Sequence, residues 1–579
     1  MKLWHYSHLQ GLSSQVVKWF LITFISLASL LFIYPSAFIY PKDTLPDNND
    51  TRLIAYIIGQ VQSNILEHKP LHYGTFFFPD QNTLAYSDLF LTSALMMLPA
   101  RLFTEHPIVI FNLALTFNFV LTIISSYLLF GYLFKDHWIT TLGVILFNFS
   151  GFHLSYFPHL QIFSLWPLCL SIYFFVRYLN ENRTIFLLLF FLIVTVQIAE
   201  SIFPSYLIFF ACLIIILFGK TNVAGALANN RTQAGTRLRE IRVRFWRGPK
   251  RNRFASIFIH SLPFIPIWIF LLLPYYQLHT SLPEATRPLR DAAHFSLGLD
   301  QIFTFYHSWT VITIFFICAT ARVLLGNYPL KQKRGIFLLK KNFCDEAKAA
   351  AKRWLSGLRF PQKNTDERPE KIWWIVFFFS ITMSLGPVLK IFGQTVKIFD
   401  LPIPLPYTLF YYLFPGFTGF RTPSRFIILA LLSAVVIIGF QLKPIFEKLK
   451  LKTKIIFIFL VTSFLFLEAD LPLKSYPINI NMHPVYGQVK NLPADAVILE
   501  LPIKLWNMPD HEIESVRSLY SLFHNHRRFG GFSGFATNRW IRLVQNINAY
   551  GPTPPIVQEL QSLGVTHIIQ NNILSPLPF

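Results

Sequence analysis

Ionisable residues are scarce in this chain, and those that could do chemistry gather in a few places. Of the 579 residues, 53% are hydrophobic and only 14% are charged. Asp43, Asp47 and Asp50 nevertheless lie close together, directly after the first long apolar run. Carboxylates beside a membrane-spanning segment either face water in a loop or form a functional site. In a site, such a carboxylate can take the proton from an attacking hydroxyl group.

Groups that could complement these carboxylates stand at the ends of later apolar runs. Asp88 precedes one run, while His159 and Gln161 stand at the start of another. Arg421 and Arg425 lead into a third. Arginine binds carboxylates and phosphates bidentately, so this pair could hold an anion.

Transmembrane helices must position these groups. Mean hydropathy is +0.45, and apolar runs close to the roughly 20 residues of a membrane span recur along the chain. The first run lacks a small-residue cleavage site, so we interpret it as a retained anchor. We expect about eleven spans in an all-α polytopic bundle: Trp19–Ile39, Phe111–Phe134, Ile139–Phe152, Leu160–Tyr178, Ile185–Ala199, Phe203–Phe218, Ser256–Tyr276, Val311–Leu325, Ile372–Leu389, Phe426–Phe440 and Ile455–Leu467.

The net charge of +22 is concentrated in loops between these spans. Residues 220–255 hold ten basic residues and one acidic residue, and residues 326–371 hold twelve against five. A third basic loop runs from Lys443 to Lys454. The positive-inside rule predicts that all three are cytoplasmic, as is the N-terminus, and that they contact anionic lipids. The charge therefore indicates topology rather than nucleic-acid binding.

The three basic loops share one side only if Leu89–Leu102 does not cross the membrane. This segment is also too short to span, so we expect an interfacial helix there. The first outer loop, residues 40–107, would then contain a second, amphipathic helix over Leu53–Leu66 that lies on the membrane surface. Arg421 and Arg425 would face the outside, against the positive-inside bias, which favours a role in binding an anion.

The last part of the chain has the composition of a water-soluble unit. Asp495–Pro502 predicts a buried strand, and Pro555–Leu563, Gly564 and Val565–Ile569 predict a helix, its cap and a strand. We therefore expect a transmembrane domain over residues 1–470 and a small extracytoplasmic α/β domain over residues 471–579. The four cysteines show neither a disulfide framework nor a metal-binding pattern.

Each candidate group also has a structural interpretation. Asn49 or Asp50 could cap the helix that follows, and Asp88 stands where it could cap another. His159 could bond a backbone carbonyl at the membrane interface. Arg421 and Arg425 could anchor lipid headgroups.

Three sets of residues resemble the GT-C class of integral-membrane glycosyltransferases, and the third also resembles bacterial multi-spanning proteins of the YfhO kind. The sets are Asp47–Arg52; Phe76–Asp80 and Leu84–Asp88 with His159–Gln161; and Pro415–Phe417 with Phe420–Phe426. The resemblance implies a bacterial plasma-membrane enzyme that uses a polyprenyl-phosphate-linked sugar. Asp50 is then the catalytic base with Asp47 second, and Asp88 positions the acceptor or a divalent cation. The substrate-binding residues are Arg52, Asp88, His159, Gln161, Arg421 and Arg425.

The expected function is transfer of a sugar from this lipid-linked donor to an extracytoplasmic acceptor. Two alternatives belong to other classes. One is a transporter or translocator of lipid-linked glycans, although we find no inverted repeat and few charges within the spans. The other is a non-catalytic relative that binds glycan or assists envelope assembly.

Overall fold

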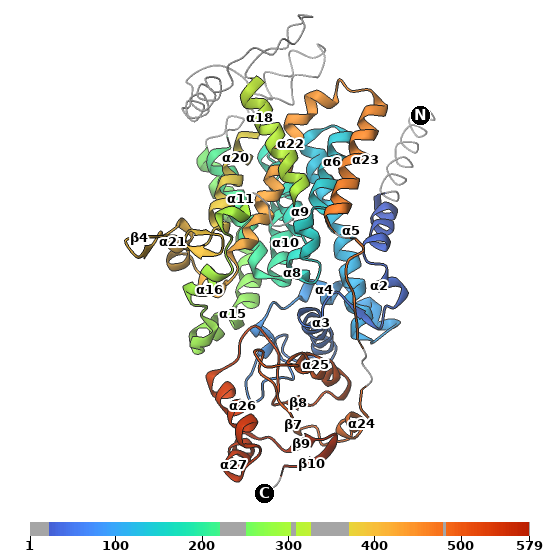
Figure 1. The fold of residues 1–579 in the computed structure, drawn as a ribbon, viewed down its shortest axis with the longest axis vertical. Helices are drawn as coiled ribbons and strands as arrows, with labels where there is room; N and C mark the ends of the chain where they lie inside the picture. The colour runs from blue at the N-terminus through green and yellow to red at the C-terminus, as the bar shows by residue number, and fades with distance from the viewer. Residues whose placement is uncertain are drawn as a thin grey trace, which may run out of the picture.

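The chain folds into a bundle of membrane-spanning helices with a smaller α/β unit at one end (Figure 1). The computed structural model describes residues 22–219, 250–302, 308–325, 370–469, 471–478 and 482–577. We call residues 482–577 the C-terminal unit, and the end of the bundle that meets it the domain end. Within the described residues, five helical stretches are long and apolar enough to cross a membrane: Pro107–Phe134, His137–Ser155, Leu160–Glu181, Arg253–Ser281 and Pro423–Phe446. The chain is therefore a helical membrane protein.

Apolar runs account for the helices of the bundle. A helix over Ile22–Ile33 and the short α2 (Ser36–Ile39) come first. The helices that follow are α5 (Pro107–Phe134), α6 (His137–Asn148), α7 (Gly151–Ser155), α8 (Leu160–Phe163), α9 (Trp166–Glu181), α10 (Thr184–Glu200), α11 (Ile202–Phe218), α14 (Lys250–Ser261), η3 (Leu262–Phe264), α15 (Ile265–Ser281), α18 (Trp309–Leu325), α20 (Glu370–Ser384), η6 (Pro423–Phe426), α22 (Ile427–Phe446) and α23 (Leu451–Glu468).

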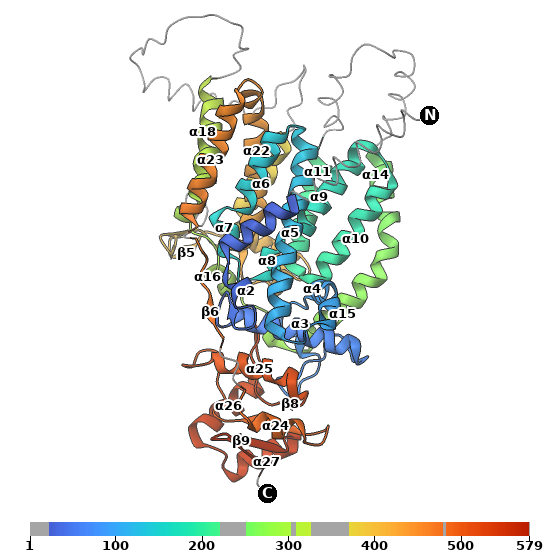
Figure 2. The ribbon, with the colours of Figure 1, turned by 90° about the vertical axis from the view of Figure 1, so that its right-hand side faces the viewer.

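The described parts of the predicted spans are mostly helical, several of them interrupted, and the span predicted over Ile372–Leu389 ends as a helix at Ser384. Residues 19–21 of the first predicted span lie outside the described residues. So do residues 220–249 and 326–369, the larger parts of two predicted basic loops. Helices that border these stretches, α11, α14 and α20, have their bordering ends away from the C-terminal unit (Figures 1 and 2).

Helix α22 is the centre of the bundle. Every residue from Ile427 to Gly439 is buried, as expected of a helix that is apolar around its whole circumference. It packs against α20, α6 and α18. Gly439 lets the ring of Phe134 approach the α22 backbone, because a Cβ atom there would lie 2.2 Å from that ring.

The segment between the first helix and α5 forms β1 (Thr44–Leu45), α3 (Asp50–Leu66), η1 (Thr83–Tyr86), α4 (Leu91–Met96) and η2 (Leu98–Leu102). The apolar stretch Leu89–Leu102 is thus divided between a helix of 6 residues and one of 5 residues. Neither can cross a bilayer, which needs about 20 residues.

The helix predicted over Leu53–Leu66 is present as α3, but the prediction that it lies on the membrane surface is wrong. Twelve of its residues are buried, on both faces. One face packs on α4 and α5, and the other packs on α25 (Glu512–His524) of the C-terminal unit. At Gly59 a Cβ atom would lie 2.8 Å from Leu522 of α25. The face of α3 that we expected to contact lipid is covered by α25 instead. This contact could not be predicted locally, because α25 comes from the far end of the chain.

The C-terminal unit is built on a four-stranded mixed sheet in the order β10-β9-β7-β8. Strand β7 is parallel to β8 and β9, and β10 is antiparallel to β9. The predicted strand within Asp495–Pro502 is confirmed as β7, and the predicted helix and strand near Gly564 are confirmed as α27 and β9. The elements are α24 (Val485–Lys490), β7 (Val497–Glu500), α25, β8 (Arg527–Arg528), α26 (Asn538–Tyr550), α27 (Pro554–Leu563), β9 (His567–Gln570) and β10 (Ile573–Pro576).

The first loop and the C-terminal unit are joined by buried hydrogen bonds. The backbone of Thr75 accepts from the Arg528 amide at 2.7 Å, and the Phe78 amide donates to Arg528 at 3.0 Å. The Thr75 hydroxyl lies 2.8 Å from the Tyr56 hydroxyl and 2.7 Å from the Ser521 hydroxyl. Strand β1 also pairs with β6 (Tyr476–Pro477). The loop is therefore joined to β8 by backbone hydrogen bonds, whereas β1 and β6 form a separate two-stranded sheet.

A buried ion network within the C-terminal unit holds the side chain of Arg528, the residue whose backbone bonds the first loop. Arg528 is fully buried and bonds Glu500 through Nε and Glu514 through Nη2, the latter at 2.8 Å. Arg517 pairs with Glu514 at 2.8 Å. These charges raise the pKa of Arg528 against its burial and lower the pKa of Glu500 against its burial.

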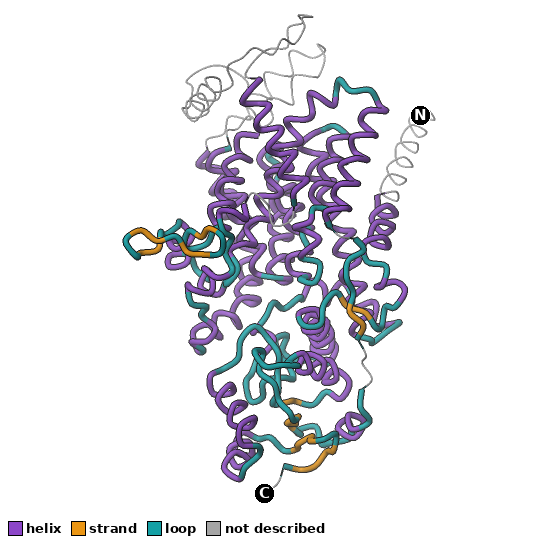
Figure 3. The backbone as a smooth tube through the Cα atoms, in the orientation of Figure 1, coloured by secondary structure: helices purple, strands orange, loops and turns teal. Residues whose placement is uncertain are grey.

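A small group of strands projects from the side of the bundle, apart from the C-terminal unit (Figure 3). Two hairpins, β2 (Lys390–Ile391) with β3 (Gln394–Thr395) and β4 (Lys397–Ile398) with β5 (Leu401–Pro402), precede α21 (Pro406–Leu413). We call residues 388–413 the side wing. The remaining elements are η4 (Pro283–Ala285), α16 (Leu289–His294), α17 (Leu299–Ile302) and η5 (Phe417–Gly419).

Candidate functional site

The first turn of α3 separates the roles of two of the aspartates. The Asp47 Oδ1 atom accepts from the backbone amides of Asn49 at 2.7 Å and Thr51 at 3.1 Å. It also accepts from the Thr51 hydroxyl. Asp47 therefore satisfies amide groups that the start of a helix leaves without intrahelical partners. We expected this structural role for Asn49 or Asp50, and Asp47 fills it instead.

Asp50, the first residue of α3, is directed toward another element. Its Oδ2 atom lies 3.2 Å from Nδ1 of His159, the residue before α8. The Asp50 side chain is 47% exposed, and the His159 side chain is 30% exposed. Burial raises the pKa of the Asp50 carboxyl, but His159, Arg421 and Arg425 together lower it below its ordinary value. The carboxyl is therefore held as a carboxylate.

Arg421 and Arg425 supply the positive charge around Asp50. They stand on either side of the start of η6, which leads into α22. The Arg421 guanidinium lies 5.3 Å from the centre of the Phe295 ring, and that of Arg425 lies 5.9 Å from the Phe203 ring. Partial burial, followed by the charge of Arg425, lowers the pKa of Arg421. Within the described part of the chain, neither arginine forms an ion pair with a carboxylate, and Arg425 Nε is buried without a hydrogen-bond partner.

Asp88 reaches the same region from the turn before α4. Its Oδ1 atom accepts from the amide of Ile202, the first residue of α11, at 3.4 Å. Burial raises the pKa of Asp88, and a hydrogen bond with Ser201, followed by the charge of Arg425, partly offsets this effect. Glu200 is buried and accepts from the amide and the hydroxyl of Ser93 at 2.8 and 2.6 Å, so it fastens α4 to the end of α10.

We refer to Asp50, Asp88, His159, Arg421 and Arg425 as the charged cluster. Two other predicted site residues have different surroundings. Arg52 donates to Asn48 Oδ1 at 3.3 Å, and the charges that act on it include Glu512 of α25. Gln161 lies in α8, and its Oε1 atom is buried without a hydrogen-bond partner.

One residue near the cluster, Arg287, was missed by the sequence analysis. Burial lowers the pKa of Arg287, and the nearby positive charge of Arg421 lowers it further. The negative charge of Asp291 partly opposes this shift. The Arg287 amide donates to Thr418, and its guanidinium donates to the backbone of Gly534 in the C-terminal unit. The signal was available, because Arg287 stands in a predicted outer loop, where a basic residue runs against the positive-inside bias.

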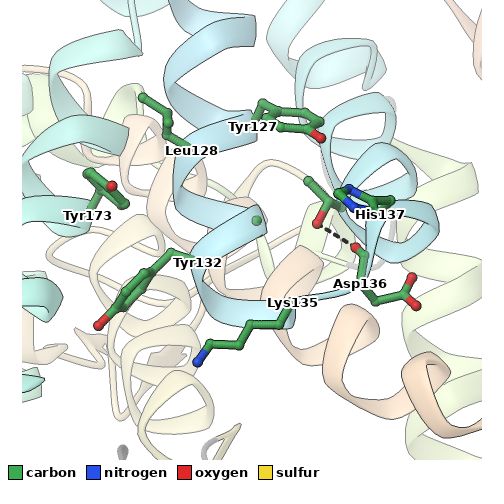
Figure 4. A pocket seen from close by; sticks show the side chains of 9 residues that line it. Tyr127, Leu128, Tyr132, Lys135, Asp136, His137 and Tyr173 are labelled. Carbon is green, nitrogen blue, oxygen red and sulfur yellow. Dashed lines mark hydrogen bonds between the residues drawn. The ribbon is translucent and has the colours of Figure 1, made fainter. Parts of the chain in front are cut away.

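The described residues contain no group of three histidine, cysteine or acidic side chains that could hold a metal ion. A cavity of about 320 Å³ lies away from the charged cluster, where α5 ends and α6 begins. Figure 4 shows the tyrosines 127, 132 and 173 around it, with Lys135 and His137 at its edge. Because α5 begins at the domain end and runs away from it, this cavity and the cluster belong to opposite ends of the bundle (Figure 2).

The charged cluster combines a carboxylate held ionised with two guanidinium groups that have no carboxylate partner among the described residues. The carboxylate can accept a proton, and the guanidinium groups can bind and stabilise a phosphate. No protein-family model matches the chain, and no curated protein is significantly similar to it. The charged cluster is therefore the feature from which a function can be inferred.

Proposed function

We propose that this protein is a membrane glycosyltransferase that moves a sugar from a polyprenyl-phosphate donor to an acceptor hydroxyl at the domain end. The observation that carries the proposal is the position of Asp50, paired with His159 and within the electrostatic reach of Arg421 and Arg425. A base and an anion-binding pair in one cluster are the two components that displacement of a phosphate by a hydroxyl needs.

In the proposed reaction, the Asp50 carboxylate takes the proton from the acceptor hydroxyl. The hydroxyl oxygen forms a bond to the anomeric carbon, and the bond from that carbon to the phosphate oxygen breaks. The released lipid phosphate keeps the bonding electron pair, and Arg421 and Arg425 stabilise its charge. His159 orients the Asp50 carboxylate. Attack opposite to the leaving group inverts the anomeric centre.

The topology proposed for this reaction has eleven spans, with the N-terminus and the basic loops in the cytoplasm. In this topology, the C-terminal unit and the charged cluster lie on the extracytoplasmic side of the membrane. This topology is supported by the helix ends that border the basic stretches, since they point away from the C-terminal unit (Figure 1). It would let the cluster meet a lipid donor at the membrane surface, as the resemblance to the GT-C class implies.

Comparison of the lipids and glycans of cells that contain or lack the protein tests this function without a choice of substrate. We expect cells that lack it to accumulate a lipid-linked sugar and to lose one glycosylated product. Wild-type protein should restore the product, and Asp50→Asn should not. Asp43→Asn is the matched control, because Asp43 lies in the same segment but its exposed side chain is outside the cluster.

Two results would overturn the proposal. One is an unchanged lipid and glycan profile in cells that lack the protein. The other is full restoration of the product by Asp50→Asn at the expression level of wild type.

A further inference from the structure

The side wing is ordered by hydrogen bonds, yet many of its apolar side chains are exposed. Its two hairpins are held in order by backbone hydrogen bonds, from Val396 to Leu389 at 2.9 Å and from Ile403 to Val396 at 3.3 Å. The wing projects sideways from the bundle (Figure 1). It is therefore an ordered projection rather than an extended loop.

Each hairpin has phenylalanine at the tip of its turn. Phe392 has φ 49° and is 82% exposed, and Phe399 has φ 51° and is 95% exposed. Two-residue hairpin turns with positive φ normally use Asn, Asp or Gly, because a bulky side chain is strained in this conformation. Both phenylalanines are thus exposed at equivalent turn positions, and the backbone of each is strained. This arrangement indicates that the tips contact an apolar phase.

Helix α21 is apolar on both of its faces. Tyr407 and Tyr411 are buried against the rest of the protein, whereas Leu409, Tyr412 and Leu413 are all more than half exposed on the other face. A helix that is apolar all round lies in a protein core or in a membrane. Helix α21 lies beside the hairpins in the same projection (Figure 1).

The position of the wing in the chain indicates that this apolar phase is the lipid bilayer. It begins shortly after α20 ends at Ser384, and the chain then returns to the spanning helix α22 at Ile427. The wing therefore lies between the ends of two membrane helices. The exposed aromatic and aliphatic side chains of the wing, together with the exposed Lys397, have the composition of a membrane interface, where aromatic rings and the stems of lysines lie at headgroup depth.

We propose that the side wing is inserted into the lipid leaflet at the domain end, with Phe392, Phe399 and the outer face of α21 among the lipid headgroups and upper acyl chains. This partner is the bilayer itself, and the proposal does not depend on the reaction proposed above. The Pro415 carbonyl accepts a 2.7 Å hydrogen bond from Tyr206 of α11, so the segment that carries Arg421 is tied to the bundle directly after the wing.

Photocrosslinking of the full-length protein in liposomes tests this placement. Benzoylphenylalanine, which resembles phenylalanine in shape, is introduced at position 392 or 399 in vesicles of phosphatidylethanolamine and phosphatidylglycerol. After irradiation, mass spectrometry of the labelled peptides measures lipid adducts. Phe270 of the exposed face of α15 is the lipid-facing reference, and Trp506, 74% exposed in the C-terminal unit, is the water-facing reference.

We expect lipid adducts at positions 392 and 399 at yields near that of position 270 and at least several-fold above that of position 506. Yields equal to that of position 506 would overturn the proposal, because the tips would then lie in water. Crosslinks to a second copy of the chain in place of lipid would also overturn it. A spin label at Phe399→Cys gives a second measurement, with greater accessibility to oxygen than to a water-soluble nickel complex as the expected result.

Discussion

Nδ1 of His159 lies 3.2 Å from Oδ2 of Asp50, and this contact joins the turn before α8 to the first turn of α3. It gives Asp50 a partner outside its own helix, whereas Asp47 is occupied with the amides of that helix. Asp47 and Asp50 lie three residues apart in the same acidic segment. In the structure, Asp47 caps the helix and Asp50 contacts His159.

Substitutions of these two aspartates should separate stability from activity. Asp47→Ala removes a helix cap and should lower the free energy of unfolding by about 0.5–2 kcal/mol, with transfer activity retained in the folded fraction. Asp50→Asn keeps the shape of the side chain and should lower the apparent Tm only slightly, through the lost attraction to His159, Arg421 and Arg425. It should lower kcat at least a hundredfold, about the contribution of a general base. Thermal unfolding and a sugar-transfer assay measure the two effects. Equal losses of activity per folded molecule would contradict this division.

The arginine pair should recognise phosphate through its shape as well as its charge. Arg425→Gln should weaken binding of a polyprenyl phosphate about tenfold or more, since a hydrogen bond to a charged group contributes about 1.5–3 kcal/mol. Arg425→Lys should recover only part of this loss, because lysine lacks the planar fork of arginine. Fluorescence binding assays with the phosphate and with the uncharged polyprenol measure the effect.

Arg290→Gln provides the control for charge, because Arg290 is almost fully exposed in the neighbouring α16. It should leave the affinity within about twofold. Loss of affinity for the uncharged polyprenol in Arg425→Gln would show that the substitution acts on the lipid chain rather than on the phosphate.

The sequence predicted the helices of the bundle better than the surroundings of individual residues. Local apolar runs determine where α5, α10 and α22 form, and these runs can be recognised without knowledge of their neighbours. The surroundings of α3 depend instead on contacts such as that between Thr75 and Ser521, which are 446 positions apart. A helix with one strongly apolar face looks the same in sequence whether lipid or another helix covers it.

The candidate site was also only partly predictable, because its residues are marked by local patterns but their arrangement depends on long-range contacts. Asp50, His159 and Arg425 could be named because charged and polar groups are rare at the ends of apolar runs. Their convergence could not be derived, since it depends on how α3, α8 and η6 are arranged in space. Arg52 has the same type of charge as Arg421, but its place on α3 brings it near Glu512 in the C-terminal unit.

The ion network around Arg528 should be essential for the stability of the C-terminal unit. Glu500→Gln leaves the fully buried Arg528 with one carboxylate partner, and breaking a buried pair costs about 3–5 kcal/mol. We expect a lower apparent Tm and faster proteolysis of the C-terminal unit. Asp495→Asn, an exposed change in the same unit, should alter neither. Unchanged proteolysis of Glu500→Gln would show that the ion network does not determine the stability of the unit.

Asp80 should make the stability of the contact between the first loop and the C-terminal unit depend on pH. Burial raises the pKa of this carboxyl, and the Tyr86 hydroxyl, which donates to Asp80 Oδ2 at 2.8 Å, offsets only part of the effect. A raised pKa means that the folded state holds the proton more tightly than the unfolded state. The stabilisation is therefore complete below the ordinary pKa of an aspartate, about 3.9, and is lost as the pH rises through the folded-state pKa.

Asp80→Asn removes this titration but keeps a side-chain oxygen that can accept from Tyr86. The apparent Tm of the variant should therefore rise relative to wild type as the pH increases from about 4 to about 7, across the range in which a carboxyl with a raised pKa ionises. Tyr86→Phe should act in the opposite direction, because loss of the hydroxyl donor raises the pKa of Asp80 further and extends the pH range over which stability falls. Thermal unfolding of the three proteins over this pH range measures both effects. Parallel curves for wild type and Asp80→Asn would show that Asp80 does not change its protonation on folding.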